Sequence, residues 1–259
     1  MNDWNPGEYL RFNQERLRPS IDLVQPIREL SFGVIVDAGC GPGNSTQVVR
    51  ATWPESRVTG IDSSEEMIDR ARADYPDGDW RLGDVADMSS LGPADLIFSN
   101  AVIQWVPDHA ALMRHFADCL SSRGVLAVQV PLFFQMPLAA VIHDVATRSE
   151  WAQAVDGARE LFTIHSAGGY YDILTSLFQR VDIWETHYFH VMPSHRAIVD
   201  MIRSTGLRPY LERLDPDQAA RFEGEVLRGA EQVYPVQTDG AVLFPFKRLF
   251  FIGYKTNEK

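Results

Sequence analysis

The segment "VDAGCGPGNS", residues 36–45, holds glycines at positions 39, 41 and 43. Glycine has no Cβ, so the backbone there can turn sharply and can approach a ligand closely. Asp37 stands two positions before the first glycine. A dinucleotide fingerprint, G-x-G-x-x-G, would need a glycine at position 44, where this chain has Asn44. The spacing therefore speaks against a nicotinamide or flavin dinucleotide at this turn.

Two further acids, Asp62 and Asp84, also stand where a predicted strand gives way to a turn. The pattern predicts buried strands at 33–39, 57–62 and 79–84, each followed by a turn or helix, and further strands at 94–100 and 124–131. Asp62 ends the second strand and Asp84 the third. Strands that alternate with helices indicate a parallel sheet, whose ligands bind at the carboxyl ends of the strands. We therefore expect Asp37, Asp62 and Asp84 to meet at one edge.

The remainder of the chain continues this pattern less regularly. Residues 8–30 and 137–178 are expected to be helical, 180–191 a long strand, 194–232 two or three helices, and 247–255 the last strand. We expect a single domain over 1–259 with a helical cap (1–31), a cofactor-binding half (32–131) and a substrate-side half (132–259) whose segment 192–246 is a helical insertion.

Composition restricts the partners. A net charge of −11 argues against a nucleic-acid backbone as the main partner. The acidic excess lies in residues 1–179, whereas 180–259 carry acidic and basic residues in equal number. Cys40 and Cys119 offer neither a disulfide framework nor a zinc spacing. With no bilayer-spanning run, we expect a cytoplasmic protein that needs no membrane or obligatory protein partner.

Ten segments together resemble one enzyme family nearly end to end, the S-adenosylmethionine-dependent trans-aconitate 2-methyltransferases. They are "DWNPGEYLRF", "ERLRPS", "GCGPGNST", "GIDSSEEMI", "IFSNAVIQWVPDH", "GVLAVQVP", "YYDIL", "VDIWETHYFHVMPSH", "TGLRPYL" and "FPFKRLFFIGY". The resemblance implies a Rossmann-like, doubly wound, mostly parallel sheet of seven strands with the last strand antiparallel. It also implies methyl transfer from S-adenosylmethionine to one carboxylate of trans-aconitate, an anionic tricarboxylate, giving a monomethyl ester.

The resemblance assigns roles to individual residues. Asp62 would accept the ribose hydroxyls, Asp84 the adenine amino group, and the backbone N–H of Val85 would donate to the adenine. The residues expected to bind the cofactor are Asp37, Gly39, Gly41, Gly43, Asp62, Ser63, Asp84, Val85 and Asn100.

The reaction places its demands on recognition rather than on acid–base chemistry. A carboxylate of ordinary pKa is already ionised at neutral pH, so no general base is needed. The two carboxylates that do not react need cationic or hydrogen-bonding clamps, to which arginine is well suited. We expect positioning roles for Gln104, Trp105, Arg208 and His195, and substrate contacts from Trp4, Tyr9, Arg16, Tyr170, Tyr171, His190 and Arg248.

Three histidines in "THYFHVMPSH" raise the alternative of a metal site. Side chains alternate along a strand, so His187 and His190 would face opposite sides of the sheet and could not share an ion. We therefore expect no metal. His195, at the start of the next helix, and then His190 are the candidates for hydrogen bonds to a substrate carboxylate, whereas His187 is expected to be structural or exposed.

Three other functions remain open from the sequence. An NAD-dependent oxidoreductase would share the sheet and Asp62. A binding module without turnover would share the cofactor residues. A methyltransferase for another carboxylic acid, such as isopropylmalate or an acyl-carrier-bound malonyl group, would share the fold and the cofactor residues.

Overall fold

A computed structural model describes residues 17–256 of the chain. Residues 17–24 are helical and lead into the short 3-10 helix η1 (Gln25–Ile27). The predicted substrate residues Trp4, Tyr9 and Arg16 lie outside the described residues, and so does the first part, 8–16, of the predicted helical stretch 8–30.

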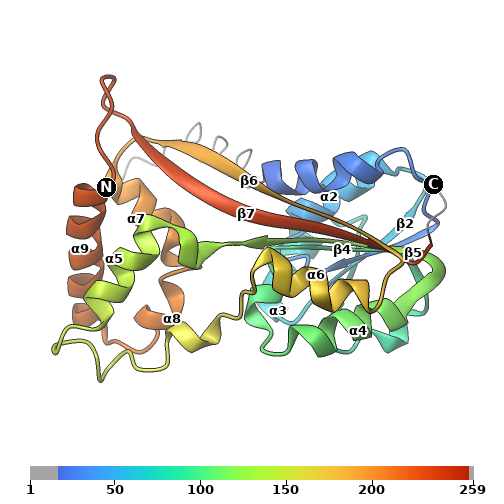
Figure 1. The fold of residues 1–259 in the computed structure, drawn as a ribbon, viewed down its shortest axis with the longest axis horizontal. Helices are drawn as coiled ribbons and strands as arrows, with labels where there is room; N and C mark the ends of the chain where they lie inside the picture. Colours follow the sequence, from blue (N-terminus) through green and yellow to red (C-terminus); the bar gives the residue numbers. More distant parts are fainter. Residues whose placement is uncertain (1–16, 257–259) are drawn as a thin grey trace. The chain divides into compact units, whose positions relative to one another are not determined.

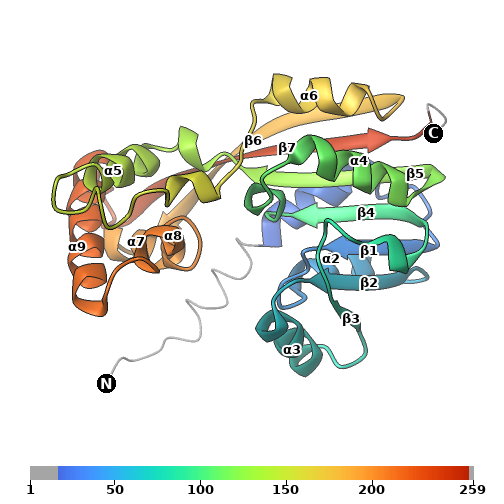
Figure 2. The same ribbon diagram turned by 90° about the horizontal axis from the view of Figure 1, so that it is seen from below.

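Seven strands form one sheet in the order β3-β2-β1-β4-β5-β7-β6. The first five pair in parallel, and Figure 2 shows them side by side. The order reverses between β1 and β4, which is where doubly wound sheets bind their ligands. The strands are β1 (Val34–Ala38), β2 (Arg57–Asp62), β3 (Asp79–Leu82), β4 (Ala94–Asn100), β5 (Leu120–Pro131), β6 (Arg180–Met192) and β7 (Val242–Tyr254).

Strand β7 runs antiparallel to both of its neighbours. Against β5, the N–H of Leu132 donates to the carbonyl of Lys247 and the N–H of Lys255 donates to the carbonyl of Gly124. Against β6, the N–H of Gln179 donates to the carbonyl of Tyr254 at the far end of β7. Farther along β6, Glu185 pairs with Lys247 of β7 at 2.6 Å, so the residue numbers run in opposite directions in both strand pairs. The predicted α/β fold, with a seven-stranded, mostly parallel sheet and an antiparallel last strand, is confirmed.

The chain forms two compact units, each built from separate segments. Unit 1 contains residues 1–130, 163–184 and 249–259, and unit 2 contains 131–162 and 185–248. The first change of unit falls beside the predicted division at residue 131. Strands β6 and β7 each contribute one part to unit 1 and one part to unit 2.

The helices of unit 1 cover both faces of its sheet. Helix α2 lies on one face, and α4 and α6 lie on the other (Figure 1). Side chains cap three of the helices: Ser64 accepts from Met67 N–H, Asp108 from Ala111 N–H and Ser166 from Gly169 N–H. The helical elements are α2 (Asn44–Thr52), α3 (Glu65–Asp74), η2 (Ser89–Leu91), η3 (Ile103–Trp105), α4 (His109–Cys119) and α6 (Ala167–Thr175).

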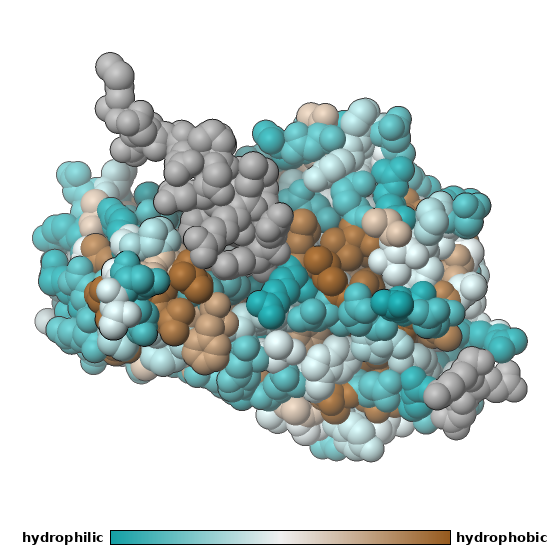
Figure 3. Space-filling model, turned by 90° about the horizontal axis from the view of Figure 1, so that it is seen from above, coloured by the Kyte–Doolittle hydropathy of each residue, from teal (hydrophilic) through white to brown (hydrophobic). Residues whose placement is uncertain are grey.

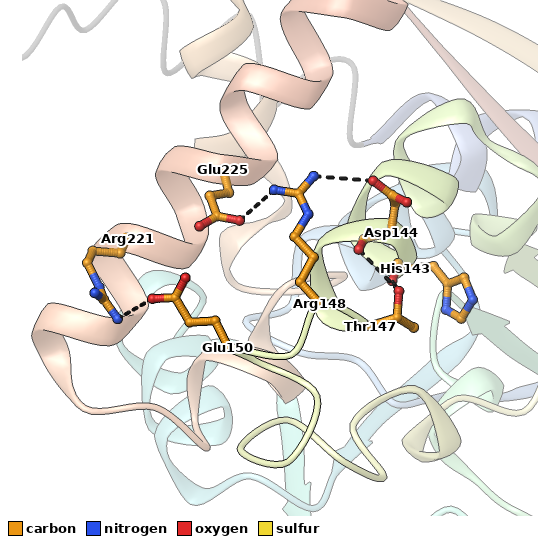
Figure 4. A network of polar contacts seen from close by, with 7 residues as sticks. All are labelled: His143, Asp144, Thr147, Arg148, Glu150, Arg221 and Glu225. Atoms are coloured by element: carbon orange, nitrogen blue, oxygen red, sulfur yellow. Dashed lines mark hydrogen bonds and ion pairs between the residues drawn. The ribbon is translucent and has the colours of Figure 1, made fainter.

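Unit 2 is mainly helical, and its helices α5 and α9 pack along each other (Figure 1). Arg148 joins them through ion pairs to Asp144 at 3.2 Å and to Glu225 at 2.7 Å, and Arg221 pairs with Glu150 at 2.7 Å (Figure 4). Its helical elements are η4 (Phe133–Gln135), α5 (Pro137–Ala146), η5 (Arg159–Leu161), α7 (His195–Arg203), α8 (Arg208–Leu211) and α9 (Pro216–Val233). Three helices within 194–232 agree with the prediction.

The prediction for the last strand was wrong at its start, because β7 begins at Val242 rather than at residue 247. Pro245 argued against a strand over residues 242–246, since proline has no N–H to donate to a neighbouring strand. Strand β5 ends at Pro131, and Leu132 already pairs with Lys247, so residues before Lys247 have no β5 partner. The missing N–H of Pro245 therefore costs no hydrogen bond on that side. The segment between β6 and β7 is correspondingly shorter than predicted.

Other boundaries also differ from the prediction. Strand β5 starts at Leu120, before the predicted 124. The residues 121–123 are polar and partly or fully exposed, so the sequence pattern did not indicate a buried strand there. Residues 137–178 are not continuously helical: turns follow α5, and Gly157 adopts a φ of +71°, which ends any regular helix. Helix α4 begins after Pro107, with Asp108 as its cap.

The surface drawn in Figure 3 is mainly hydrophilic, with apolar side chains gathered in a few places. Exposed apolar residues of unit 2 include Phe189 on β6 and Leu243 on β7. Among residues 17–256, no helix combines the length and the apolar character that crossing a bilayer requires.

Candidate functional site

The glycine turn after β1 uses each of its three glycines differently. Gly39, Gly41 and Gly43 all have positive φ values, of 79°, 53° and 90°. A Cβ on Gly39 would lie 2.2 Å from the side chain of Val102, and one on Gly43 would lie 2.7 Å from Trp80. A Cβ on Gly41 would meet nothing within 4 Å. The outer glycines thus permit tight packing, and the middle one leaves its backbone open to a ligand.

Asp62, at the end of β2, fixes this turn from the neighbouring strand. Its Oδ2 accepts from the N–H of Gly41 at 2.9 Å, and its Oδ1 accepts from the N–H of Ser64 at 2.9 Å. A carboxylate can accept about four hydrogen bonds. Asp62 therefore keeps the capacity to accept hydroxyl groups as well as ordering the turn.

Asp37 is fully buried in β1, beneath the start of α2. Its Oδ2 accepts from the hydroxyls of Thr46 at 2.6 Å and Ser45 at 2.9 Å. Burial and, to a smaller extent, the nearby charge of Asp62 raise the pKa of Asp37 to about 6, against the opposing effect of the two hydroxyl donors. A cation close to the carboxylate would reverse this shift.

Buried acceptor atoms without partners mark the carboxyl ends of β1 and β4. Asp37 Oδ1, Asn100 Oδ1 and Gln104 Oε1 are all buried, and none has a hydrogen-bond partner among the described residues. Buried polar atoms are nearly always satisfied, so such a group calls for a ligand or water. Three acceptors, one of them a carboxylate, suit a cationic ligand. Gln47 Nε2 on α2 is a buried donor in the same condition and suits an anionic group.

The predicted adenine-binding residues lie farther along the same sheet edge. Strand β3 ends at Leu82, so Asp84 follows the strand by two residues instead of ending it. Its Oδ1 accepts from the N–H of Ala86 at 2.9 Å, which makes an exposed turn, and Val85 is buried. Ser63 is exposed beside Asp62. Asp37 thus lies within β1, Asp62 at the end of β2 and Asp84 just after β3, on three adjacent parallel strands.

The 3-10 turn η3 follows β4 and carries Gln104 and Trp105. Ala101, two residues before η3, has a φ of +59°, a strained value for a residue with a side chain. The amide of Gln104 donates to the carbonyl of Ala101 at 2.7 Å. Gln104 is buried and Trp105 half-buried. The turn packs on the glycine turn, since Val102 occupies the space next to Gly39.

In unit 2, the predicted substrate residues His190 and Arg248 come together on one face of the sheet. The guanidinium carbon of Arg248 lies 4.5 Å from the ring centre of Phe246, and the His190 ring lies 5.7 Å from the same ring. Both polar residues are buried: Arg248 is 8% exposed and His190 is 4% exposed. A cation and an imidazole beside the same phenyl ring are groups that can bind carboxylates. His187 is exposed on the opposite face, in agreement with the alternation.

Other predicted substrate residues have protein partners in the structure. His195 Nε2 lies 2.7 Å from the carbonyl of Tyr234, and a carbonyl can only accept, so Nδ1 could donate to a carboxylate only in the protonated ring. Arg208 begins α8, is exposed and pairs with Glu212 at 3.7 Å. Tyr170 and Tyr171 lie inside α6. Tyr170 is fully buried, and Tyr171 is exposed.

Two polar residues of the region were missed from the sequence. Gln47 sits in an ordinary helical stretch, and no local pattern marks it. His109 follows "VPD" at the start of α4, and no local pattern distinguishes it as a site residue. Its buried ring contacts both Ile103 and Tyr170, which only the fold brings together. Within residues 17–256, no cluster of three or more His, Cys, Asp or Glu could hold a metal ion.

Comparisons with known proteins agree with this geometry. A family model described as a methyltransferase domain matches residues 9–208. A protein of Escherichia coli O7:K1 named trans-aconitate 2-methyltransferase is 41% identical over 99% of this chain and 100% of its own length. The relative of the same name from Shigella flexneri is 40% identical over the same shares. The chain belongs to the trans-aconitate 2-methyltransferase family. The family resemblance and the methyltransferase class predicted from the sequence are confirmed.

Solved structures extend the comparison of the fold beyond trans-aconitate 2-methyltransferases. YcgJ from Bacillus subtilis matches with a TM-score of 0.57 and 14% identity, covering 93% of this chain and 100% of that one. Phosphoethanolamine N-methyltransferase 2 from Haemonchus contortus, solved with phosphomonomethylethanolamine and S-adenosylhomocysteine, matches with a TM-score of 0.57 and 11% identity. This match covers 91% of this chain and 52% of that one. At such low identity these structures support the fold alone.

Proposed function

We propose that this enzyme transfers a methyl group from S-adenosylmethionine to one carboxylate of trans-aconitate, giving the monomethyl ester and S-adenosylhomocysteine. The observation that carries the proposal is the identity of about 41% with enzymes of that name over 99% of the chain. Segments outside the cofactor turn, such as "VDIWETHYFHVMPSH", share in the resemblance.

The residues at the sheet edge suit the cofactor. Asp37 Oδ1 and Asn100 Oδ1 are buried acceptors that an ammonium group would satisfy, and Gln47 Nε2 would serve a carboxylate. The open backbone of Gly41 and the remaining acceptor capacity of Asp62 provide for a ribose. Asp84 and the N–H of Val85 would hold the adenine. When bound, S-adenosylmethionine supplies an electrophilic methyl group on a sulfonium.

No residue of this chain has to act as an acid or base. The substrate carboxylates are ionised at neutral pH, so the nucleophile is ready on binding. The protein contributes by holding the reacting oxygen in line with the methyl carbon and by excluding water from the pair. Gln104 and Trp105, on a turn whose backbone is strained at Ala101, are suited to this positioning.

Recognition of the non-reacting carboxylates falls to cationic and hydrogen-bonding side chains. His190 and Arg248 both lie beside Phe246 in unit 2, and their burial strengthens any ion pair that they form. A hydrogen bond to a charged group contributes ~1.5–3 kcal/mol. We therefore propose that these two side chains bind carboxylates of the substrate. Contacts from Arg208, His195, Tyr171 and the residues before Leu17 stay predictions.

A second substrate class remains a candidate within the same chemistry. Another small polycarboxylate or a malonyl-type acid offers the same reacting group, and few substitutions would be needed to change the preference. The proposed substrate is small and anionic, so neither nucleic acid nor a protein partner is required, and the net charge of −11 disfavours the former. A cytoplasmic location is part of the proposal and can be tested by cell fractionation.

Transfer of a radiolabelled methyl group into a panel of mono-, di- and tricarboxylic acids tests the proposal. The highest kcat/KM is expected with trans-aconitate, and esterification of monocarboxylates at an equal rate would contradict carboxylate clamping. A thermal melt with S-adenosylhomocysteine and with NAD separates the enzyme classes: stabilisation by NAD alone would favour an oxidoreductase. Stabilisation by S-adenosylhomocysteine with no transfer to any acid would favour a binding module.

A further inference from the structure

His109 lies at the first position of α4 and is fully enclosed, with 1% of its surface exposed. Its Nε2 lies 2.7 Å from the carbonyl oxygen of Ile103, and its Nδ1 lies 2.9 Å from the hydroxyl of Tyr170. A carbonyl can only accept, so Nε2 carries the hydrogen and Nδ1 accepts from Tyr170. Both nitrogens of a neutral imidazole are thus satisfied, and the tautomer is fixed by two different elements.

The surroundings keep this ring neutral. Burial lowers the pKa of His109, and the nearby His165 ring adds to the shift, against the opposing effects of two backbone carbonyls and of Asp108. The positive end of α4 disfavours a charged ring at this position as well. The His109 ring stacks on the Tyr170 ring at 5.5 Å and meets the His165 ring edge-on at 5.0 Å. The imidazole therefore has one orientation and one protonation state.

Through the carbonyl of Ile103, the His109 ring holds the turn η3 in place. Ile103 begins the turn, and Gln104 and Trp105 complete it. A second contact holds the same turn, because the N–H of Thr163 donates to the carbonyl of Gln104 at 2.9 Å. Residues 163–170 thus fix η3 twice, once directly through Thr163 and once through the Tyr170–His109 pair. Val102, just before the turn, fills the space beside Gly39.

We propose that His109 is a positioning residue of the methyl-transfer site: oriented by Tyr170, it holds the carbonyl of Ile103 and so fixes the turn that carries Gln104 and Trp105. This inference rests on the proposed function, in which Gln104 and Trp105 position the reactants. His109 itself touches neither substrate nor cofactor in this scheme. Its effect is exerted on kcat through the placement of the turn.

Two substitutions separate the two hydrogen bonds of the ring. The amide nitrogen of glutamine can take the place of Nε2, so His109→Gln keeps the donor to Ile103. The shorter asparagine reaches only the place of Nδ1, so His109→Asn keeps the partner of Tyr170 and loses the donor. The proposal expects kcat to fall about 10- to 100-fold in His109→Asn, the scale of a misplaced reactant, and to stay within about threefold of the wild type in His109→Gln.

The affinity for S-adenosylhomocysteine, measured by calorimetry, is expected to be unchanged in both variants, because Asp62 and the glycine turn are intact. Equal kcat values for the two variants, or a loss of affinity parallel to the loss of kcat, would overturn the proposal. If His109→Asn does not fold, His109→Leu removes the same donor while filling the space with apolar atoms. The same fall in kcat is expected of it, and wild-type kcat would contradict the proposal.

A readout that needs no turnover is the fluorine NMR signal of Trp105 in 5-fluorotryptophan-labelled protein with S-adenosylhomocysteine bound, assigned with Trp105→Phe. The signal should shift or broaden in His109→Asn and match the wild type in His109→Gln. A wild-type signal in His109→Asn would refute the role of His109 in ordering the turn. Absence of methyl transfer by the wild type would instead refute the proposed function, and the signal would still report on His109.

Discussion

The carboxylate of Asp62 accepts a hydrogen bond of 2.9 Å from the backbone N–H of Gly41, across the gap between two neighbouring strands. One side chain therefore shapes the cofactor turn and, in our proposal, also binds the ribose. We expect Asp62→Ala to weaken S-adenosylhomocysteine binding at least about 10-fold, because each hydrogen bond to a charged acceptor contributes ~1.5–3 kcal/mol. Calorimetry measures the change.

A matched control for this substitution is Asp74→Asn, which removes an acidic charge from the exposed surface of α3. It should leave the affinity unaltered. Full affinity in Asp62→Ala would show that the carboxylate has no part in holding the cofactor.

The buried Asp37 predicts a stability that changes with pH. Its pKa is raised from 3.8 to about 6 in the folded protein, so folding favours the protonated form. The stabilisation from Asp37 is therefore full below pH 4 and is lost as pH rises through 6, by an amount on the order of 3 kcal/mol. Denaturant unfolding of wild type and Asp37→Asn at several pH values measures it. A constant difference between the two proteins from pH 4 to 7 would contradict the prediction.

The same group predicts a pH dependence of cofactor binding in the opposite direction. A cationic amino group next to Asp37 favours the ionised carboxylate, so affinity for S-adenosylhomocysteine should rise as pH increases through about 6. Titration calorimetry from pH 5 to 8 tests this. Asp37→Asn should show weaker binding with no step near pH 6, and a step of wild-type size in this variant would assign it to another group.

Arg248 predicts a separation of substrate recognition from cofactor binding. Arg248→Lys keeps the charge but loses the planar fork, and we expect the KM for trans-aconitate to rise about 10-fold, the value of one charged hydrogen bond. The affinity for S-adenosylhomocysteine should not change. Arg196→Gln, which removes an exposed arginine from α7, is the control and should leave KM unaltered. An unchanged KM in Arg248→Lys would remove Arg248 from the substrate site.

Two arginines on α7 predict different contributions to stability. Arg203 pairs at 3.1 Å with Glu223, whose side chain is only 7% exposed, whereas Arg196 pairs with Asp200 at the exposed surface. Arg203→Ala leaves a buried carboxylate without its cation and should cost about 1–3 kcal/mol. Arg196→Ala should cost less than about 0.5 kcal/mol. Equal losses in chemical unfolding would mean that the Glu223 carboxylate is adequately solvated without Arg203.

The sheet could be predicted because its signals are local. A short apolar run that ends in turn residues, such as Gly33–Gly39, is sufficient to define a buried parallel strand. The early start of β7 could not be predicted, because Pro245 is acceptable only where β5 has already ended. That condition depends on strand order, which no local pattern contains.

Some residues of the candidate site likewise have a local sequence signal, whereas others are brought together only by the fold. Asp37, Asp62 and Asp84 were found because each stands at or just after a strand end, and parallel pairing then brings them to one edge. His190 and Arg248 are far apart in sequence, and the antiparallel pairing of β6 with β7 places both beside Phe246. The proposed positioning role of His109 could not be predicted from the sequence, because it depends on contacts with Tyr170 and Ile103 that form only when the chain packs.

The close approach of Val102 to Gly39 means that the glycine turn after β1 and the turn after β4 cannot change independently. Because a Cβ on Gly39 would lie within 2.2 Å of the Val102 side chain, any larger residue at position 39 requires a smaller one at 102. In our proposal one turn binds the methyl donor, and the other, through Gln104 and Trp105, positions the acceptor. A change of acceptor that alters the turn after β4 must therefore keep the space beside Gly39 that the glycine turn needs.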